Sequence, residues 1–437
     1  MVEGVRLVAQ NKKDIDAGIY ISNRLLKSGF NLIKLINQIN LKEEAMKIKA
    51  IKTFPYDGVW RDLIFIKVET DEGIYGWGEA GTMGRDRANE ATIHEIEHYL
   101  IGKDPGQIEL HWNTLYRDSY WRPDYTLLNA LAGVEMALWD ILGKSLDVPV
   151  YKLLGGEFHS RIPVYNNAWY FSPTSRAKTL EDYGKLAKKA VAQGFKHLKW
   201  DPWWDPGTDY FIGKKDMRWA KECVKIVREA VGSDIELLIE MHGRFSPEDA
   251  IQAARELEEY NPYFIEEPIC PDCSVDALAR VRNSTRIPVA AGERVLTRWG
   301  FWEVFEKQAV AIAQPDIVHC GGISEMKKIA AMAQVSYVGF APHISEGPVE
   351  VASLVHIDAS TPNLLIQEFF YPDMPLYETI MKDPFPVPKD GFIELPTKPG
   401  LGVELDEKAL TGKPFKYRPG LVLGGLWGEG LRTFAQR

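Results

Sequence analysis

Three glutamates carry the clearest chemical pattern in this sequence. Glu240, Glu266 and Glu293 each follow a short apolar run and are spaced 26 and 27 residues apart. Three carboxylates placed side by side repel one another unless a cation lies among them, and oxygen ligands favour Mg²⁺ or Mn²⁺ over Zn²⁺. The pattern therefore predicts one divalent metal site. Glu267 is the alternative to Glu266, which we favour because Glu267 faces the other side of the strand by alternation.

A histidine and an aspartate at neighbouring strand ends are candidates for a catalytic base. Asp316 and His343 follow two consecutive predicted strands, which permits a dyad in which the carboxylate fixes the tautomer of the imidazole and raises its basicity. His242 lies two residues beyond Glu240, on the same side of that strand. It is either a second acid or base, or a partner of the metal ligands.

Three further polar residues follow predicted strands. Glu368 ends the last strand, and a protonated carboxyl group there is able to donate a hydrogen bond to an enolate oxygen. Lys199 and Asp201 lie on the other flank. Lys199 either balances a substrate carboxylate or pairs with Asp201, and the sequence leaves both interpretations open.

The residues that must position these groups alternate between short apolar strands and amphipathic helices. Such an alternation predicts a closed parallel barrel with its chemistry at the carboxyl ends of the strands. An open doubly wound sheet would carry a G-x-G-x-x-G turn after its first strand, and this sequence has none. The predicted strands are 164–169, 195–200, 235–241, 263–266, 289–293, 312–317, 339–343 and 364–368.

The chain divides into four predicted segments. Residues 1–45 form an N-terminal extension, and we hypothesise that Met46 is the true start; a surface helix or an oligomer contact is the alternative. Residues 46–157 form an α+β unit with a hairpin turn at 71–73, and residues 158–370 form the barrel. Residues 371–437 are a C-terminal segment.

The composition of the chain argues against several classes of function. The 437 residues are 45% hydrophobic and 26% charged, as in folded proteins, and a net charge of -9 without a basic patch argues against nucleic acid. Four cysteines are too few for a secreted disulfide scaffold, and Cys270-Pro-Asp-Cys273 lacks further zinc ligands nearby. We found no apolar run of 18 residues and no signal peptide. These features predict a cytoplasmic enzyme.

Several motifs resemble the mandelate racemase/muconate lactonizing enzyme branch of the enolase superfamily. The resemblance runs from about residue 46 to 410 and implies a modified TIM barrel, (β/α)₇β, beneath an α+β capping domain that the C-terminal segment completes. The motifs are the helix at 130–144, Pro149-Val-Tyr-Lys-Leu-Leu-Gly-Gly, Ile265-Glu-Glu-Pro, Ala291-Gly-Glu-Arg, Gln314-Pro-Asp and Pro399-Gly-Leu-Gly-Val.

Within that branch, Glu240-Met-His-Gly-Arg-Phe resembles the dehydratases that act on galactonate or gluconate. The resemblance implies a hydro-lyase that binds one Mg²⁺ per active site. It implies that His343, assisted by Asp316, takes the proton at carbon 2, that His242 protonates the departing hydroxyl at carbon 3, and that Glu368 supports the enediolate. The product would be a 2-keto-3-deoxy acid, and relatives often form homo-oligomers.

Two other functions stay open. Racemases of the branch carry K-x-K at the second strand, and Asp201 replaces the second lysine here, which weakens the racemase reading but leaves an epimerase that uses both histidines. A non-catalytic binding protein would be expected to have lost part of this residue set. The acid-sugar substrate is expected to contact Lys199, Asp201, Trp60 and Arg61, with the last two on a loop of the capping domain.

Overall fold

The computed structural model of this protein places most of the chain from Met46 onward. The N-terminal extension, Trp60 and Arg61 lie outside the described residues. The described residues are 46–58, 62–81, 84–172, 175–203, 211–271, 274–344, 347–370, 374–383 and 387–415.

An antiparallel sheet and four helices make up the described part of the first α+β unit. Strands β1 (Ile48–Asp57), β2 (Asp62–Thr70) and β3 (Tyr75–Ala80) lie in sequence order, and the predicted turn joins β2 to β3. Helix α5 (Tyr125–Ser145) is apolar and long enough to span a membrane by composition alone, but 83% of its most apolar window is buried inside the protein. The other helices are α3 (Asp86–Leu100), α4 (Ile108–Asp118) and the short α6 (Val150–Leu153).

The barrel is closed, as predicted. In the described part of the chain, eight parallel strands follow one another around it, and β13 returns to pair with β4. The remaining gap between β12 and β13 is bridged by Phe340 and Leu364. The strands are β4 (Arg161–Asn167), β7 (His197–Trp200), β8 (Glu236–Glu240), β9 (Phe264–Glu266), β10 (Val289–Ala291), β11 (Ile312–Ala313), β12 (Gly339–Phe340) and β13 (Gln367–Phe369).

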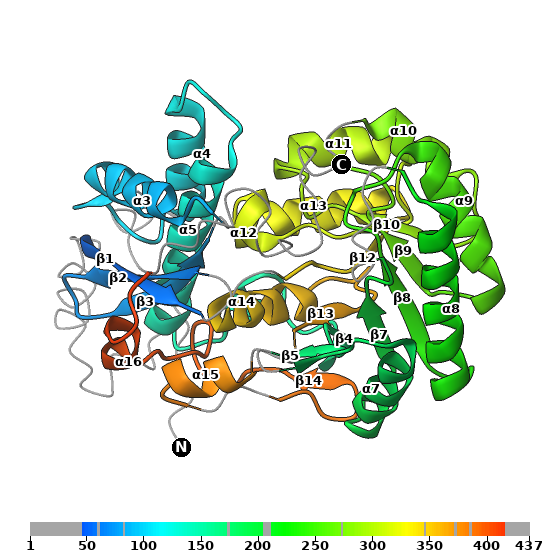
Figure 1. The fold of residues 1–437 in the computed structure, drawn as a ribbon. Helices are drawn as coiled ribbons and strands as arrows, with labels where there is room; N and C mark the ends of the chain where they lie inside the picture. Colours follow the sequence, from blue (N-terminus) through cyan, green and yellow to red (C-terminus); the bar gives the residue numbers. More distant parts are fainter. Residues whose placement is uncertain are drawn as a thin grey trace, which may run out of the picture. The chain divides into compact units, whose positions relative to one another are not determined.

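Helices alternate with these strands along the chain (Figure 1). Local signals set their ends: Thr179 forms a capping box at the start of α7, Ser246 caps α9, and Gly232 closes α8 at φ +80°. Among the described residues, the barrel helices are α7 (Leu180–Ala192), α8 (Lys214–Val231), α9 (Pro247–Leu257) with a 3₁₀ turn at Glu258–Tyr260, α10 (Val275–Arg282), α11 (Thr297–Glu306), α13 (Ile323–Val335) and α14 (Pro348–Ala359).

Several predicted strands are shorter in the structure than expected, and the difference is largest at β11. The prediction ran from 312 to 317, but β11 ends at Ala313 and the short helix α12 (Ile317–Cys320) begins at Ile317. The side chain of Asp316 accepts hydrogen bonds from two backbone N–H groups of α12. Asp316 is therefore a helix cap as well as a residue at the barrel rim, because capping requires a short acceptor immediately before the helix.

The C-terminal segment contacts both parts of the chain. Strand β14 (Phe392–Glu394) pairs with β4, whereas Tyr75 donates a 2.8 Å hydrogen bond to Glu404 and Lys67 lies 2.6 Å from Glu407 on α16 (Glu407–Thr411). These contacts support our proposal that the segment, with α15 (Met374–Ile380), completes the capping domain. We also propose domain boundaries near residues 157 and 370. A small hairpin of β5 (Phe171–Ser172) and β6 (Ser175–Arg176) follows β4.

Two carboxylates of the α+β unit hold two barrel helices. Glu135 of α5 accepts hydrogen bonds of 2.8 and 2.9 Å from the first two backbone N–H groups of α13. Glu79 of β3 accepts bonds of 2.9 and 3.0 Å from the second and third residues of α14. A negative charge at a helix N-terminus satisfies unpaired N–H groups and interacts favourably with the helix dipole. Any side chain at Gly322 or Gly347 would collide with these carboxylates.

We expect Glu135→Gln to flatten the pH dependence of stability. Burial raises the pKa of Glu135 to about 7 from an ordinary 4.5, despite the donors around it. Between these values the folded protein keeps the proton while the unfolded chain loses it. The contribution of Glu135 to the free energy of unfolding is therefore fully present below pH 4.5. It falls by about 3 kcal/mol as the pH rises through 7. Urea unfolding across this range measures the free energy of unfolding.

The control is Glu95→Gln, which changes an exposed glutamate of α3. This variant should keep the wild-type slope of stability against pH. Equal slopes for the wild type and Glu135→Gln would contradict the prediction.

Candidate active site

A buried lysine lies at the centre of the barrel mouth. Lys199, the third residue of β7, is 1% exposed. Its Nζ lies 2.7 Å from Glu266 Oε1, 2.8 Å from Glu368 Oε1 and 3.5 Å from Glu240 Oε2. Burial alone would lower the pKa of the Lys199 ammonium, but the charges of Glu266 and Glu368 hold this pKa well above its ordinary value. Lys199 is therefore a fixed buried cation.

The three predicted metal ligands gather at the same place. Glu240 and Glu266 end the neighbouring strands β8 and β9 and are almost fully buried, and Glu293 lies two residues beyond β10. Burial and the charge of Glu266 raise the pKa of Glu240 well above its ordinary value. Gln314 donates a 2.7 Å hydrogen bond to Glu266. Nearby positive charges lower the pKa of Glu266 and of Glu293, so Glu240 is the carboxylate whose negative charge its surroundings balance least.

The predicted base lies beside this group. Asp316 Oδ2 is 2.8 Å from His343 Nδ1, and His343 Nε2 is 3.1 Å from Glu293 Oε2. Burial would lower the pKa of His343, but Glu293, Glu368 and Asp316 outweigh it and raise this pKa to about 10. The expected Asp–His dyad is present in the geometry, with the Nε2 side of the ring turned toward a predicted metal ligand.

The second histidine has its own aspartate. His242 Nδ1 is 2.9 Å from Asp201 Oδ2, and Arg244 donates a 2.6 Å hydrogen bond to the same oxygen. The backbone N–H of His242 donates to Glu240 at 2.6 Å. Of the two interpretations left open for Lys199, the pairing with Asp201 is therefore not the one observed, because Asp201 turns toward the end of β8.

Glu368 accepts all of its described hydrogen bonds. Asn167 Nδ2 lies 2.6 Å and Lys199 Nζ 2.8 Å from one oxygen, and the backbone N–H of Ile344 lies 3.1 Å from the other. All three partners donate, so both carboxylate oxygens of Glu368 act as acceptors here. The expected role as a protonated hydrogen-bond donor to an enolate gains no support from these contacts.

Glu267, the alternative ligand, faces a different group. Its backbone has φ +39°, and its carboxylate lies 3.2 Å from Arg294 Nη2. Glu266 instead contacts Lys199 and Gln314 inside the barrel. This difference supports the choice of Glu266 over Glu267.

Sequence reasoning missed four polar residues of this site: Asn167, Arg244, Gln314 and Arg294. Arg294 contacts Glu293 and Glu267, whereas Asn167 ends β4, the one strand whose end was not considered. Position at a strand end was therefore the signal that could have identified Asn167. Gln314, Arg244 and Arg294 lay inside noted motifs but were given no role of their own.

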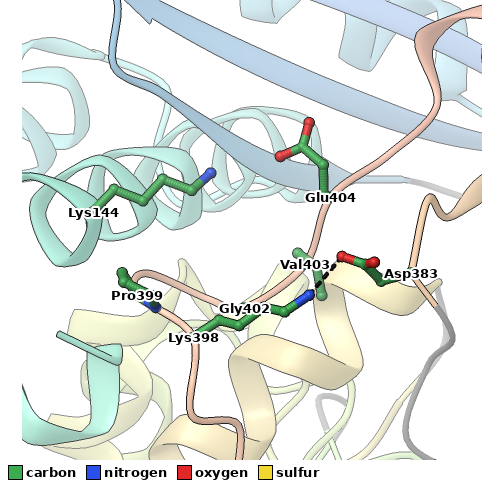
Figure 2. Close-up of a pocket in the computed structure, with 7 residues that line it drawn as sticks. All are labelled: Lys144, Asp383, Lys398, Pro399, Gly402, Val403 and Glu404. Atoms are coloured by element: carbon green, nitrogen blue, oxygen red, sulfur yellow. Dashed lines mark hydrogen bonds and ion pairs between the residues drawn. The ribbon is translucent and has the colours of Figure 1, made fainter. Parts of the chain in front are cut away.

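A separate surface cavity contains none of the predicted site residues. This cavity has a volume of about 320 Å³. Lys398 pairs with Asp383 there at 2.6 Å, and Figure 2 shows the two side chains. Its charged groups largely neutralise one another, so it offers no comparable chemistry. The lining residues are Lys144, Asp383, Lys398, Pro399, Gly402, Val403 and Glu404.

The glutamate group fits a divalent cation by its chemistry. Among the residues described, no three acidic, histidine or cysteine side chains surround a common point at ligand distance, and Lys199 and His343 contact two of the carboxylates. Nevertheless, two buried carboxylates lie beside the partly exposed carboxylate of Glu293, and the pKa of Glu240 is raised by burial and by neighbouring carboxylates. A hard cation would relieve that repulsion.

The closed barrel and its charged rim define a barrel enzyme with its reactive groups at the carboxyl ends of the strands. The chain belongs to the mandelate racemase/muconate lactonizing enzyme family of the enolase superfamily. Residues 50–155 match the N-terminal domain of that family, and residues 182–409 match its enolase C-terminal domain-like part. The family and fold inferred from the motifs are therefore confirmed.

Relatives cover almost the whole described chain. The D-galactonate dehydratase of Xanthomonas euvesicatoria pv. vesicatoria is 39% identical over 380 residues, covering 84% of this chain and 94% of that protein. The D-galactonate dehydratase of Cronobacter sakazakii is 37% identical over 374 residues, with the same coverage. A solved enolase-superfamily member from Salmonella Typhimurium has a TM-score of 0.80 at 31% identity, covering 84% of this chain and 98% of that one.

We expect Lys199→Met to destabilise the protein by about 3–5 kcal/mol in the absence of divalent cations, because Glu266 and Glu368 would remain as buried, unbalanced charges. Added Mg²⁺ should restore more stability to this variant than to the wild type. Urea unfolding with EDTA or Mg²⁺ measures both effects.

The matched control is Lys221→Met, because Lys221 also pairs with two glutamates but lies at the surface. It should change stability by about 1 kcal/mol or less. A Lys199→Met variant as stable as this control would show that the buried cation is not required.

Proposed function

We propose that this protein is a Mg²⁺-dependent acid-sugar dehydratase that forms a 2-keto-3-deoxy acid and water. One observation carries the proposal: His242 and His343 are each hydrogen-bonded through Nδ1 to an aspartate, and both contact the glutamate group. Dehydration needs a base for the proton at carbon 2 and an acid for the hydroxyl at carbon 3. The names of the D-galactonate dehydratase relatives support the reaction class and a sugar-acid substrate.

His343 is the proposed base. Asp316 holds the Nδ1 side of the ring, so the proton from carbon 2 goes to Nε2. The base must be neutral to accept it, yet the surrounding carboxylates favour the charged ring. A cation bound among the glutamates would lower the pKa of His343 and so favour the neutral ring. Metal binding and the function of the base are therefore expected to depend on each other.

Glu240, Glu266 and Glu293 are the proposed ligands of one Mg²⁺ per active site, and members of the enolase superfamily generally use this ion. When bound, Mg²⁺ supplies electrostatic stabilisation of the charge that develops on the substrate carboxylate. We propose that Lys199 adds a second positive charge there and that Glu368 holds Lys199 in place. Asp201 reaches the substrate only through its neighbours, because both its oxygens accept hydrogen bonds from the protein.

His242 is the proposed acid that protonates the departing hydroxyl. Trp60 and Arg61 remain proposed substrate contacts, and a cytoplasmic homo-oligomer remains the proposed form of the protein. The same two histidines also support an alternative function, epimerisation at carbon 2, in which one ring removes the proton and the other returns it to the opposite face.

A screen of sugar acids with Mg²⁺ is expected to yield a 2-keto-3-deoxy product from at least one of them. His343→Asn and Glu266→Gln should each lower kcat by about 10²-fold or more, because the first removes the base and the second a ligand. His98→Asn, an exposed change on α3, is the control and should retain full activity.

Activity that survives both His343→Asn and Glu266→Gln would refute the mechanism. Reactions in D₂O separate the two functions. Deuterium that enters carbon 2 without loss of water would favour the epimerase.

Removing divalent ions is expected to abolish activity, and Mg²⁺ or Mn²⁺ should restore it. Glu293→Gln should raise the Mg²⁺ concentration needed for half-maximal activity by about 10-fold or more, because a neutral amide binds Mg²⁺ less tightly than a carboxylate. Calorimetric titration measures the affinity directly. Glu306→Gln changes an exposed glutamate of α11 and should leave it unchanged; equal losses in both variants would count against the site.

A further inference from the structure

A second aspartate–histidine pair lies at the barrel rim. Asp201 follows β7 and His242 follows β8, and Asp201 Oδ2 contacts the Nδ1 atom of His242 at 2.9 Å. The Asp201 side chain is fully buried, whereas the His242 side chain is 23% exposed. The aspartate thus lies behind the ring, and only the histidine is partly accessible.

The orientation of Asp201 is fixed from behind. Its Oδ1 accepts a 2.8 Å hydrogen bond from the backbone N–H of Trp203, a buried residue that packs against Phe245 at 5.1 Å between ring centroids. Rotating the carboxylate would break this buried hydrogen bond, which is costly. Asp201 therefore presents Oδ2 to His242 in one direction.

The backbone of His242 is fixed as well. It adopts φ +50°, which is uncommon for a residue other than glycine. Its N–H donates to Glu240 at 2.6 Å, and its carbonyl accepts a 3.1 Å hydrogen bond from Arg294. A strained backbone of this kind persists where its surroundings hold it, and such residues cluster at active sites.

The Asp316–His343 pair has the same construction. One oxygen of Asp316 accepts backbone hydrogen bonds from Val318 and His319, and the other contacts His343 Nδ1. In both pairs a backbone donor orients one carboxylate oxygen and the second oxygen holds Nδ1 of the ring. The shared arrangement indicates that the aspartate orients the histidine ring in both pairs.

We propose that Asp201 is a positioning residue that keeps a proton on Nδ1 of His242, so that the proton given to the departing hydroxyl comes from Nε2. This inference rests on the proposed dehydratase function. The step requires a proton on both ring nitrogens: the Nε2–H bond breaks as the new O–H bond forms, and the neutral ring that remains keeps its proton on Nδ1. The electron pair released at carbon 2 forms the carbon 2–carbon 3 double bond, and the carbon 3–oxygen pair leaves with water.

Arg244 contacts the same oxygen of Asp201 and helps to hold this aspartate. Its guanidinium lies 2.6 Å from Asp201 Oδ2 and favours the ionised aspartate. An alternative role for Asp201 is to hold Arg244 alone, with His242 as a bystander. Variants at Asp201 and Arg244 separate these two roles.

The first test needs no substrate. In protein labelled with ¹⁵N-histidine, long-range ¹H–¹⁵N spectra show which ring nitrogen carries the proton, and comparison with His242→Gln identifies the signals of that ring. We expect the Nδ1-protonated form in the wild type and in Arg244→Met, and loss of this preference in Asp201→Asn and Asp201→Ala. Asparagine cannot accept from both Trp203 and His242, and alanine offers no acceptor. An unchanged tautomer in Asp201→Ala would overturn the proposal.

The second test uses the reaction. Asp201→Asn and Asp201→Ala should lower kcat for dehydration by about 10²-fold or more, with KM changed by less than about threefold. Exchange of the carbon 2 proton in D₂O, which depends on His343, should continue. Equal losses of exchange and dehydration would indicate a merely structural role, and a rise in KM alone that Arg244→Met reproduces would indicate that Asp201 serves Arg244.

The two proposals can fail separately. A wild-type protein that dehydrates no sugar acid contradicts the proposed function, whereas the spectra of the ring decide the role of Asp201 without any substrate.

Discussion

The structure of the active site depends on how buried negative charge is balanced at the barrel mouth. Parallel strands bring their carboxyl ends to one rim, so Glu240, Glu266 and Glu368 meet around a single point. Removing charges from water is expensive unless partners compensate for it. Lys199 supplies that compensation from inside the barrel, and the neutral donors Gln314 and Asn167 orient the carboxylates.

This balance links the glutamates to the two histidines. The charge of Glu293 and its neighbours controls the proton on His343, while Glu240 holds the backbone of His242. The proposed metal ligands and the proposed acid–base groups are therefore coupled electrostatically. A cation bound by the glutamates is expected to change the protonation of the base as well as to stabilise charge on the substrate.

The α+β unit supports the same rim because its carboxylates cap the N-termini of two barrel helices. Glu135 caps α13, which follows the Asp316 cap of α12, and Glu79 caps α14, which follows the strand that precedes His343. The helices on either side of the Asp316–His343 pair are thus held by carboxylates from outside the barrel. Capping bonds of this kind are directional, so they help to fix the positions of Asp316 and His343.

The sequence by itself determined the elements and the location of the site. Alternating apolar runs and acids at strand ends predict a closed barrel with a charged rim, because hydrophobic periodicity is a local property. Only the tertiary structure decided which of these side chains contact one another. Lys199 contacts Glu266 and Glu368 rather than Asp201, because strand register and side-chain reach across the barrel depend on contacts between distant residues.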